Sequence, residues 1–320
     1  GKSRGDGTSM GDAFTLDTWD GHNELVKRDH GNPDVRRYLL DVVEWWITEF
    51  GISGLRLDAA DVIPEPFLKE LRAHCASLDS EFWLLGEIVH GDYTRLANPE
   101  TLHSVTNYEC YKGLYSSHND ANYFEIAHSL KRQFQDPGIY DYFHPYNFAD
   151  NHDVDRVASS LKERSHLYPL YILLFGMPGI PSVYYGSEWG IEGAREPDSD
   201  APLRPSMEEV ARRPAGDEAL FSLLSRLAGL RKEYQALQNG SYRELLVEHQ
   251  QLAFLRESDA DQVVVAVNAS EEEVALELPI PDSEGVFVDL LNGTGERHVV
   301  DGTLRCTVLP RWGALLGRRR

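Results

Sequence analysis

At residues 51–60 the chain reads Gly51-Ile52-Ser53-Gly54-Leu55-Arg56-Leu57-Asp58-Ala59-Ala60, a short apolar run that ends in an arginine and an aspartate. Alternate residues of a β-strand share a face, so Arg56 and Asp58 project together, opposite Leu55 and Leu57. A charged pair in an apolar strand is costly unless the groups pair or lie at the strand's end. The stretch therefore predicts a buried strand with a site at its carboxyl end.

The length and composition indicate a globular protein. The chain has 320 residues, of which 42% are hydrophobic and 10% aromatic, enough for a large core and too apolar for disorder. No apolar run is long enough to span a bilayer. The formal net charge of −21 repels phosphate backbones and anionic lipids, which argues against nucleic acid and membrane partners and favours a neutral or cationic ligand.

The cysteines and the first residues of the chain give evidence about the cellular location of the protein. Cys75, Cys110 and Cys306 are far apart and lack CxxC spacing, so neither a disulfide framework nor a zinc site is predicted. The first ten residues do not have the basic start and apolar core of a signal peptide. These observations favour a cytoplasmic location, but the chain begins at Gly1 without a methionine, and we expect residues upstream of it.

Strand and helix patterns alternate after residue 32, which is typical of a parallel sheet. Asn32 and Pro33 begin a helix with an apolar stripe that runs to Phe50. Apolar strands are predicted to start at 52, 82, 104, 146 and 180, and helices at 65–77, 123–135, 155–175 and 217–237. Residues 1–32 are glycine-rich, and their apolar residues recur with neither the helical nor the strand period, so this segment is interpreted as a loop.

Beyond residue 240 the apolar residues recur at every second position, which predicts six short strands between 244 and 309. The predicted fold class is α/β followed by an all-β antiparallel domain. Three parts are expected: the end of a loop or insert region at 1–32, an α/β part at 33–238, and a β-sandwich-like domain at 239–320.

Three successive strands of the α/β part end in acids, Asp58, Glu87 and Asp153. The carboxyl ends of parallel strands converge at one edge, where sites of α/β proteins are built. Repulsion between neighbouring carboxylates favours one protonated acid beside an ionised one. Hydrolysis of a glycosidic bond needs such a pair.

Four ordered segments carry a resemblance to a known family. They are Gly-x-Arg-x-Asp at 54–58, Gly-Glu at 86–87, Asn-His-Asp at 151–153, and Gly-Met-Pro-Gly-Ile-Pro-x-x-Tyr-Tyr-Gly-x-Glu at 176–188. Together they resemble the α-amylase family, glycoside hydrolase family 13. The resemblance covers residues 12–235, and the domain after it is similar to the family's C-terminal antiparallel domain. It implies a TIM (β/α)8 barrel.

The resemblance also implies roles for the three acids. Asp58 would be the nucleophile that forms a glycosyl-enzyme intermediate, Glu87 the general acid and then the base, and Asp153 the group that stabilises the transition state. A retaining pair needs carboxyl groups about 5–5.5 Å apart, which adjacent strand ends can provide. Arg56 is expected to lie against Asp58 and keep it ionised.

The predicted substrate-binding residues are Arg56, Asn151, His152, His90 and Trp19. His152 would contact sugar hydroxyls beside Asp153, and His90 an acceptor subsite. Loop aromatics are further stacking candidates, whereas Trp45, Trp46 and Trp83 are predicted to be core. A polar segment after the last strand forms either a cleft rim or a solvated loop, the latter being favoured; its charged residues are Arg195, Asp198, Asp200 and Arg204.

The chain departs from the family by lacking an earlier strand with its Asp, Asn and His. Its five α/β strands correspond to the fourth through eighth of the barrel, so the barrel is predicted to be partial. Such a remnant would expose two strand edges. We expect a truncation; a second chain that completes the barrel is the alternative, and activity of the 320 residues alone is left open.

The resemblance implies a retaining α-glycoside hydrolase acting on α-glucans or maltodextrins. Residues 24–29 loosely resemble a short motif of neopullulanases and cyclomaltodextrinases. The alternatives are an α-glucan transglycosylase, an α-1,6-glucosidase, or a non-catalytic module that binds carbohydrate or a partner; a phosphate-binding barrel lacks its glycine-rich loop. No cofactor is required for this chemistry. Calcium in a full-length enzyme and a homodimer are left open, and the calcium ligands are not identifiable in this sequence.

Overall fold

The computed structural model of the chain describes residues 18–19, 22–140, 142–212, 217–282 and 284–320. The chain divides into two compact units. The smaller consists of residues 1–87 and 93–103, and the larger of residues 88–92 and 104–320. Each unit has its own strands, helices and candidate site residues, and we describe them in turn.

The smaller unit is built around two parallel strands, β3 (Gly54–Leu57) and β4 (Trp83–Gly86). Helix α2 (Glu65–Leu78) connects them and buries one apolar face. Helix α1 (Pro33–Phe50) packs against α2 and leads into β3. The remaining elements are β1 (Thr18–Trp19), β2 (His22–Val26) and the 3-10 turns η1 (Ala60–Val62) and η2 (Tyr93–Arg95). The predicted order of strand, helix and strand over 52–87 is confirmed, but β3 is half-buried with Arg56 exposed, so the prediction of a buried strand is wrong.

Helix α1 has the predicted ends. The Asn32 side chain accepts a hydrogen bond from the Asp34 backbone N–H at 2.9 Å, which satisfies one of the unpaired donors of the first turn. At the other end Gly51 has a φ of 62°, the left-handed conformation that glycine adopts without a Cβ clash. Local sequence determines both ends, so they could be predicted.

The burial of α1 was predicted wrongly. Trp45 and Trp46, expected in the core, are 53% and 39% exposed, and Tyr38 and Phe50 are 67% and 63% exposed. Trp83, in β4, is half-buried. Helical periodicity shows which residues share a face. It does not show whether another element covers that face, and this is why the prediction failed for α1.

The larger unit begins with the remaining parallel strands. Residue Thr106, just after β5 (Ser104–Val105), bridges Tyr146 at the start of β6 (Tyr146–Phe148), which pairs in parallel with β7 (Ile180–Ser182). The described part of this unit has seven helices, of which the first four lie between these strands and the last three follow β7: α3 (Tyr108–Asn119), α4 (Phe124–Phe134), α5 (Val157–Ser160), α6 (Leu167–Gly176), α7 (Met207–Arg212), α8 (Glu218–Glu233) and α9 (Gln235–Asn239). Short 3-10 turns are η3 (Arg164–His166), η4 (Ser187–Trp189) and η5 (Ala201–Leu203). All five predicted α/β strands, β3 to β7, are present.

Helix α3 was missed, because the strand predicted from 104 was extended to Tyr108. Asn107 instead caps α3, since its side chain accepts from the Cys110 backbone N–H at 3.2 Å. The single helix predicted at 155–175 is also wrong. Asn119 at the end of α3 accepts from the Lys162 N–H and donates to the Ser160 carbonyl, both at 2.8 Å. These bonds replace helical ones and separate α5 from α6.

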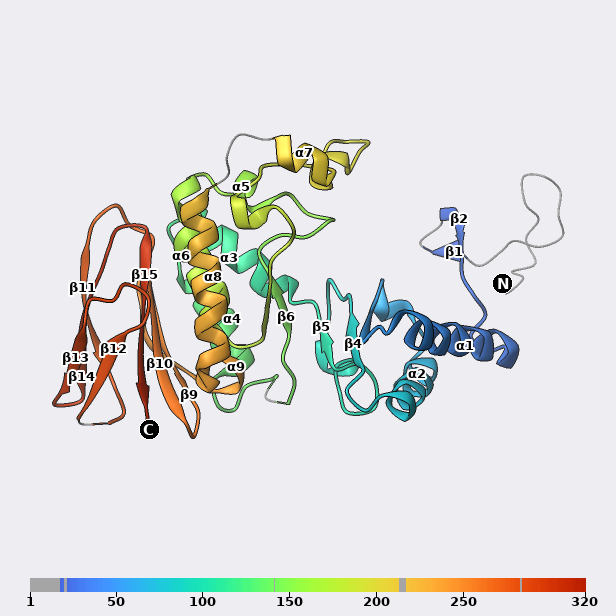
Figure 1. Cartoon of the computed structure of the whole chain (residues 1–320), viewed down its shortest axis with the longest axis horizontal. Coiled ribbons are helices and arrows are strands. Elements are labelled where there is room, and N and C mark those ends of the chain that lie inside the picture. Colours follow the sequence, from blue (N-terminus) through green and yellow to red (C-terminus); the bar gives the residue numbers. More distant parts are fainter. Residues whose placement is uncertain (1–17, 20–21, 141, 213–216, 283) are drawn as a thin grey trace. The chain divides into compact units, whose positions relative to one another are not determined.

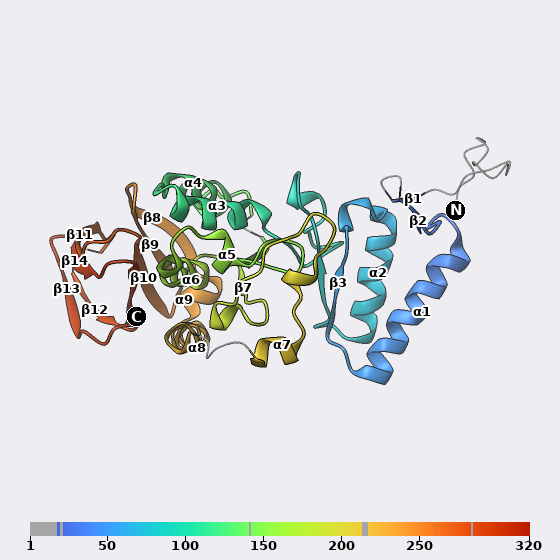
Figure 2. The ribbon, with the colours of Figure 1, turned by 90° about the horizontal axis from the view of Figure 1, so that it is seen from above.

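The chain ends in an eight-stranded antiparallel sheet in the order β11-β14-β13-β12-β15-β10-β9-β8. The strands are β8 (Ser241–Val247), β9 (Gln251–Glu257), β10 (Asp261–Asn268), β11 (Val274–Pro279), β12 (Gly285–Asp289), β13 (Glu296–Val300), β14 (Thr303–Val308) and β15 (Trp312–Arg319). The edge strands β8 and β11 also lie in contact, so the sheet curls toward closure around its own core. The other face of β10 and β15 packs on α6, beside α8 (Figure 1, Figure 2).

Six strands were predicted in this domain, and the structure has eight, because β13 and β15 were not predicted. Strand β15 lies at the centre of the sheet, between β10 and β12. It carries two glycines, which usually weaken a strand pattern. At Gly313, however, a Cβ would come within 2.8 Å of Ala266 O and of Ile172 Cγ2. Close packing of α6 on the sheet therefore requires a glycine at this position.

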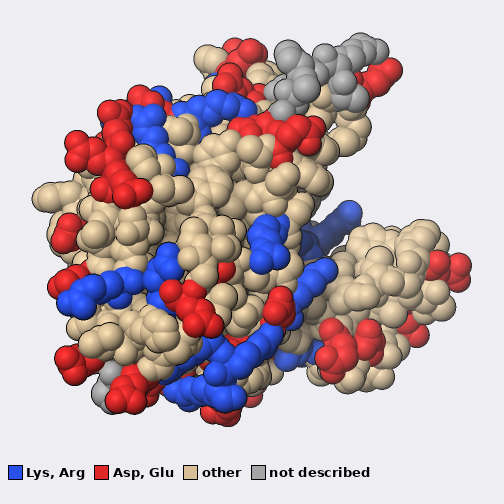
Figure 3. All heavy atoms as spheres, turned by 60° about the vertical axis from the view of Figure 1, so that its left-hand side comes forward, with Lys and Arg blue, Asp and Glu red and all other residues tan. Residues whose placement is uncertain are grey.

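Basic and acidic side chains are interspersed on the face that the C-terminal sheet presents (Figure 3). Several form pairs, such as Arg305 Nε with Glu277 Oε1 at 2.8 Å and Arg319 Nη2 with Glu233 Oε1 at 3.2 Å. This mixture is unlike the single basic patch of a nucleic-acid-binding surface. Among the described helices, none is both long and apolar enough to cross a bilayer.

Candidate active site

Arg56 and the first two predicted catalytic acids, Asp58 and Glu87, lie together in the smaller unit. Arg56 Nη1 donates to Asp58 Oδ1, and Arg56 Nη2 lies 3.1 Å from Glu87 Oε1. One planar guanidinium therefore contacts both carboxylates, a geometry that arginine provides and lysine does not. The Asp58 side chain is 80% exposed and that of Glu87 is 13% exposed. The two acids thus share a cation but differ in access to solvent.

The backbone between the acids is held in an unusual conformation. Ala59 has a φ of 42°, in the left-handed region that residues with a Cβ rarely adopt. Its N–H donates to Glu87 Oε2 at 3.2 Å, and the Ala60 N–H donates to the Glu87 carbonyl at 3.0 Å. Strain of this kind persists where surrounding contacts determine it, and it clusters at functional sites. The turn after β3 is therefore fixed against the end of β4.

The third acid lies in the larger unit, after β6. His152 Nε2 lies 3.0 Å from Asp153 Oδ2, so the two predicted neighbours form a pair. Asn151 accepts from the Asp153 N–H at 2.8 Å, which closes a tight turn, and its amide donates to the Tyr108 hydroxyl at 3.2 Å. Asn151, predicted to bind substrate, thus shapes the loop that presents His152 and Asp153.

Arg204 completes the surroundings of Asp153. Arg204 Nη2 lies 2.9 Å from Asp153 Oδ1 and 3.2 Å from Asp200 Oδ2, and Arg204 Nε donates to the His152 carbonyl at 2.9 Å. Asp200 in turn pairs with Arg195 Nε at 2.7 Å. Arg195 and Arg204 are exposed, as predicted for a solvated loop, and the segment also borders Asp153 through Arg204. The sequence distance of 51 residues between Arg204 and Asp153 left no local signal for the contact.

A buried arginine fixes the loops that carry these groups. Arg156 is fully buried; its Nη1 donates to the Tyr185 carbonyl at 2.8 Å and its Nε to the Leu203 carbonyl at 3.0 Å. Its guanidinium also lies 4.0 Å from the centre of the Tyr184 ring. Burial lowers the pKa of Arg156. Leu203 immediately precedes Arg204, so the hydrogen bond from Arg156 to the Leu203 carbonyl fixes the backbone from which the Arg204 side chain extends.

Asp150 supports the same loops from the end of β6. Asp150 Oδ2 accepts from the Val157 N–H at 2.9 Å and from the Ser187 hydroxyl at 2.7 Å. Burial raises the pKa of Asp150, while these two hydrogen bonds and Arg156 act in the opposite direction. Asp150 and Arg156 were not predicted from the sequence, although both lie within three residues of the Asn-His-Asp segment.

The remaining predicted residues are less well defined by their contacts. His90 is exposed, and no hydrogen bond or ion pair involves it in the described part of the chain. The side chain of Trp19 lies outside the described residues. Of the loop aromatics, Tyr111 stacks on Phe148 and Trp189 stacks on Phe221, so both rings already pack against the protein. The structure therefore groups Arg56 with Asp58 and Glu87, and Asn151 with His152 and Asp153, on separate units.

The cysteines, histidines and acids of the described residues do not form a metal site. Among the described residues, no group of three or more His, Cys, Asp or Glu side chains is arranged to hold a metal ion. Cys75, Cys110 and Cys306 are buried and unpaired, and burial raises the pKa of Cys75 and of Cys306 to about 11. These thiols are parts of the core.

Comparison with known proteins places this geometry in a family. Residues 8–217 match the family model described as "Alpha amylase, catalytic domain", and residues 242–314 match "Maltogenic Amylase, C-terminal domain". A cyclomaltodextrinase of Geobacillus thermopakistaniensis is 28% identical over 92% of this chain and 49% of its own length. A neopullulanase 2 of Thermoactinomyces vulgaris is 30% identical over 90% of this chain and 49% of its length.

Solved structures agree on the fold. An α-amylase from Anoxybacillus superposes with a TM-score of 0.78 at 24% identity, over 92% of this chain and 64% of its own. A cyclomaltodextrinase structure superposes with a TM-score of 0.80 at 24% identity, over 95% of this chain and 52% of its own length. The chain spans about half the length of the curated relatives it matches. From its two family matches and its partial TIM barrel with a C-terminal antiparallel sheet, the chain belongs to the α-amylase family, glycoside hydrolase family 13.

Proposed function

We propose that this protein is a retaining α-glycoside hydrolase acting on α-glucans or maltodextrins. The observation that carries the proposal is the guanidinium of Arg56, which contacts both Asp58 and Glu87 at the ends of adjacent strands. Family membership and relatives named cyclomaltodextrinase and neopullulanase support the substrate class. The proposal concerns the activity of the whole protein, and these residues supply one part of its active site.

In the first step Glu87 donates its proton to the glycosidic oxygen while Asp58 attacks the anomeric carbon. The bond to the leaving sugar breaks, and a covalent ester forms between Asp58 and the retained sugar. The exposed carboxylate of Asp58 is open to an incoming ring. Arg56 orients the carboxylates, and the Ala59 N–H holds Glu87.

In the second step Glu87, now a carboxylate, removes a proton from water, which attacks the same carbon. The ester bond breaks, Asp58 leaves as a carboxylate and Glu87 regains its proton, so the configuration is retained. Asp153, paired with His152 and Arg204, is assigned to stabilise the cationic transition state between these species. A transglycosylase would use a sugar hydroxyl in place of water.

The decisive test is replacement of Glu87 by Gln, with turnover of maltodextrin and of nitrophenyl α-maltoside measured. We expect a loss of about 100-fold or more, within the range that general acid–base catalysis contributes. Glu81→Gln is the matched control, because Glu81 is an exposed acid of the same unit. Both variants are assayed in the full-length protein, and undiminished turnover in Glu87→Gln, or no turnover by the unaltered full-length protein, would contradict the proposal.

The nucleophile has its own test. The Glu87→Gln protein, incubated with a maltosyl fluoride, should accumulate an ester at Asp58 that peptide mass spectrometry can locate. Asp58→Asn should abolish it, whereas Asp41→Asn, at an exposed acid of α1, should not. Products with more sugar units than the maltosyl substrate would instead favour a transglycosylase. An ester at another acid would overturn the assignment of Asp58.

A further inference from the structure

A cavity of about 400 Å³ lies in the larger unit, away from the predicted catalytic acid of that unit. Its wall includes His144, two residues before β6 begins, and Pro178, two residues before β7 begins. Asp153 follows the opposite end of β6. The first strand of the C-terminal sheet, β8, closes another side through Ser241 and Tyr242. The cavity therefore opens at the amino ends of the strands, and Asp153 lies at their carboxyl ends.

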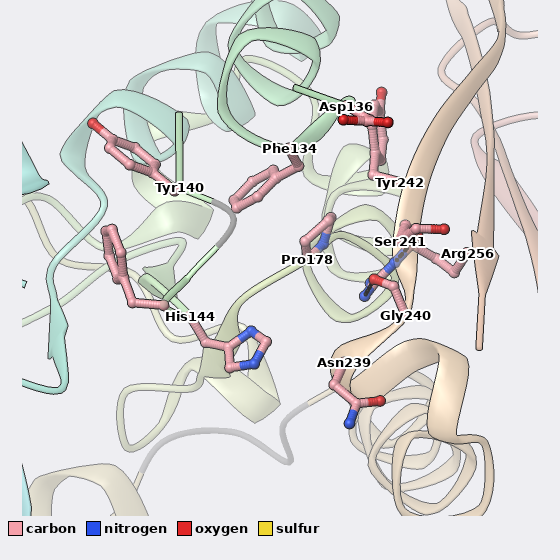
Figure 4. Close-up of a pocket in the computed structure, with 11 residues that line it drawn as sticks. Phe134, Asp136, Tyr140, His144, Pro178, Asn239, Gly240, Ser241, Tyr242 and Arg256 are labelled. Carbon is pink, nitrogen blue, oxygen red and sulfur yellow. Dashed lines mark hydrogen bonds between the residues drawn. The ribbon is translucent and has the colours of Figure 1, made fainter. Parts of the chain in front are cut away.

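The floor of this cavity is apolar and largely aromatic (Figure 4). Tyr140, Phe143, Pro178 and Tyr242 are buried, and Phe134 is half-buried with its ring among them. Tyr140 and Phe143 lie with their ring centres 5.0 Å apart. A cavity of this volume falls within the range of about 300–1,000 Å³ typical of small-molecule sites. Of these residues Phe134 offers the most surface to a ligand, and the buried rings support it.

The rim of the cavity is polar, and three of its side chains are available for hydrogen bonds to a ligand. Asp136, His144 and Asn239 are exposed, and their side chains have no hydrogen bond to another described residue. Although the His144 residue is exposed, surrounding protein atoms partly desolvate its ring, and this lowers the pKa of His144; Arg256 and Arg231 lower it further. A neutral imidazole supplies one donor and one acceptor, and the Asn239 amide supplies both kinds. The rim can therefore exchange hydrogen bonds with hydroxyl groups in either direction.

The charges argue against an anionic ligand. Arg256 lines the cavity, but it already donates to the carbonyls of Gly176, Leu237, Gly240 and Ser241. These bonds cap the ends of α6 and α9, where helix carbonyls are unpaired. Asp136 on the rim would repel an anion. A neutral ligand with an apolar face and a polar edge fits these groups better.

We propose that this cavity is a second carbohydrate site, which binds one end of a neutral α-glucan chain and lies apart from Asp153. A pyranose ring has a face of C–H groups, which would lie on Phe134, and an edge of hydroxyls, which would meet His144 and Asn239. The choice of an α-glucan over another neutral sugar rests on the proposed function. The cavity itself does not depend on it.

The test records binding in a chain that does not turn the ligand over. In the Glu87→Gln protein labelled at histidine ring carbons, the His144 signal, identified by its loss in His144→Ala, is followed during titration with maltotriose. We expect it to shift and saturate, and the Asn239→Ala and Phe134→Leu variants to weaken that affinity by about 10-fold. His298→Ala is the control, because His298 is an exposed histidine of β13.

Three outcomes distinguish the possibilities. Saturable shifts that Phe134→Leu weakens support the site, and unchanged turnover of nitrophenyl α-maltoside in His144→Ala places it apart from catalysis. A His144 signal that does not respond to maltotriose, or that responds to inorganic phosphate instead, overturns the proposal. If Glu87→Gln keeps full turnover, the proposed function fails in that assay, and the His144 titration still decides the cavity.

Discussion

Arg204 holds Asp153 at one carboxylate oxygen, with Arg204 Nη2 2.9 Å from Asp153 Oδ1, while Arg204 Nε donates to the His152 carbonyl at the same distance. His152 occupies the other oxygen of Asp153. The carboxylate is therefore oriented from two sides by groups that are close in space, one of which is distant in sequence. Arg204 acts through Asp153, so it is a positioning residue in this arrangement.

Replacing Arg204 by Ala should lower kcat on maltodextrin by about 10- to 100-fold, because a displacement near 1 Å can have an effect of that size. KM should change less, and Arg204→Lys should restore part of kcat. The measurements are kcat, KM and Tm. Arg305→Ala, which removes an exposed ion pair of the C-terminal sheet, is the control. A loss of kcat that follows a fall in Tm would assign Arg204 a purely structural role.

Arg56→Lys tests the shared guanidinium. A lysine ammonium is a point charge on a flexible stem and cannot contact two carboxylates through one planar group. We expect kcat to fall by on the order of 100-fold while the charge of the site is kept. Arg305→Lys provides the matched change at an exposed pair. Activity equal to that of the unaltered chain would show that the shared contact is dispensable.

Arg156→Leu should destabilise the protein by about 3–5 kcal/mol, the usual effect of removing one partner from a buried charged network. It would leave the Tyr185 and Leu203 carbonyls without their donor. The free energy of unfolding in urea is the measurement, and Arg305→Leu is the exposed control. A change below about 1 kcal/mol, as is usual for exposed pairs, would contradict this reading of Arg156.

Stability should fall in acid because of His118. Burial lowers the pKa of His118 to about 3, whereas an unfolded histidine titrates near 6.5. Its ring nitrogens contact the Leu114 carbonyl at 2.6 Å and the Tyr123 hydroxyl at 2.9 Å. Below about pH 6.5 the unfolded state takes up a proton that the folded state refuses. The stability present above this pH is therefore lost as the pH falls toward 3, by up to about 1.4 kcal/mol per unit.

Urea unfolding at pH 7.5 and at pH 5 measures this effect. His118→Gln should reduce the difference between the two values, and the exposed His298→Gln should not. The neighbouring His166, whose ring centre lies 5.5 Å from that of His118, has a pKa that burial also lowers. It contributes in the same direction, so the slope in His118→Gln should shrink without vanishing. An unaltered slope would rule out His118 as its source.

Local elements were predictable from the sequence to the extent that their causes are local. The cap at Asn32, the end of α1 at Gly51 and the strands that lead to Asp58, Glu87 and Asp153 each depend on a few neighbouring residues. Where partners come from afar, the prediction failed. Strand β15 has glycines that only its packing on Ile172 explains, and the break before α6 depends on Asn119.

The sequence by itself determined that Asp58 and Glu87 directly follow apolar strands, because strand periodicity and short motifs are properties of contiguous residues. Asp153, predicted to end the strand that begins at 146, instead lies in a turn beyond the end of β6. Tertiary structure alone decided that Arg56 also contacts Glu87, and that Arg204 and the buried Arg156 hold the loop of Asp153. It also decided that His144, Asn239 and Phe134 line one cavity. These contacts join residues far apart in the chain, and only the folded backbone brings their side chains within bonding distance.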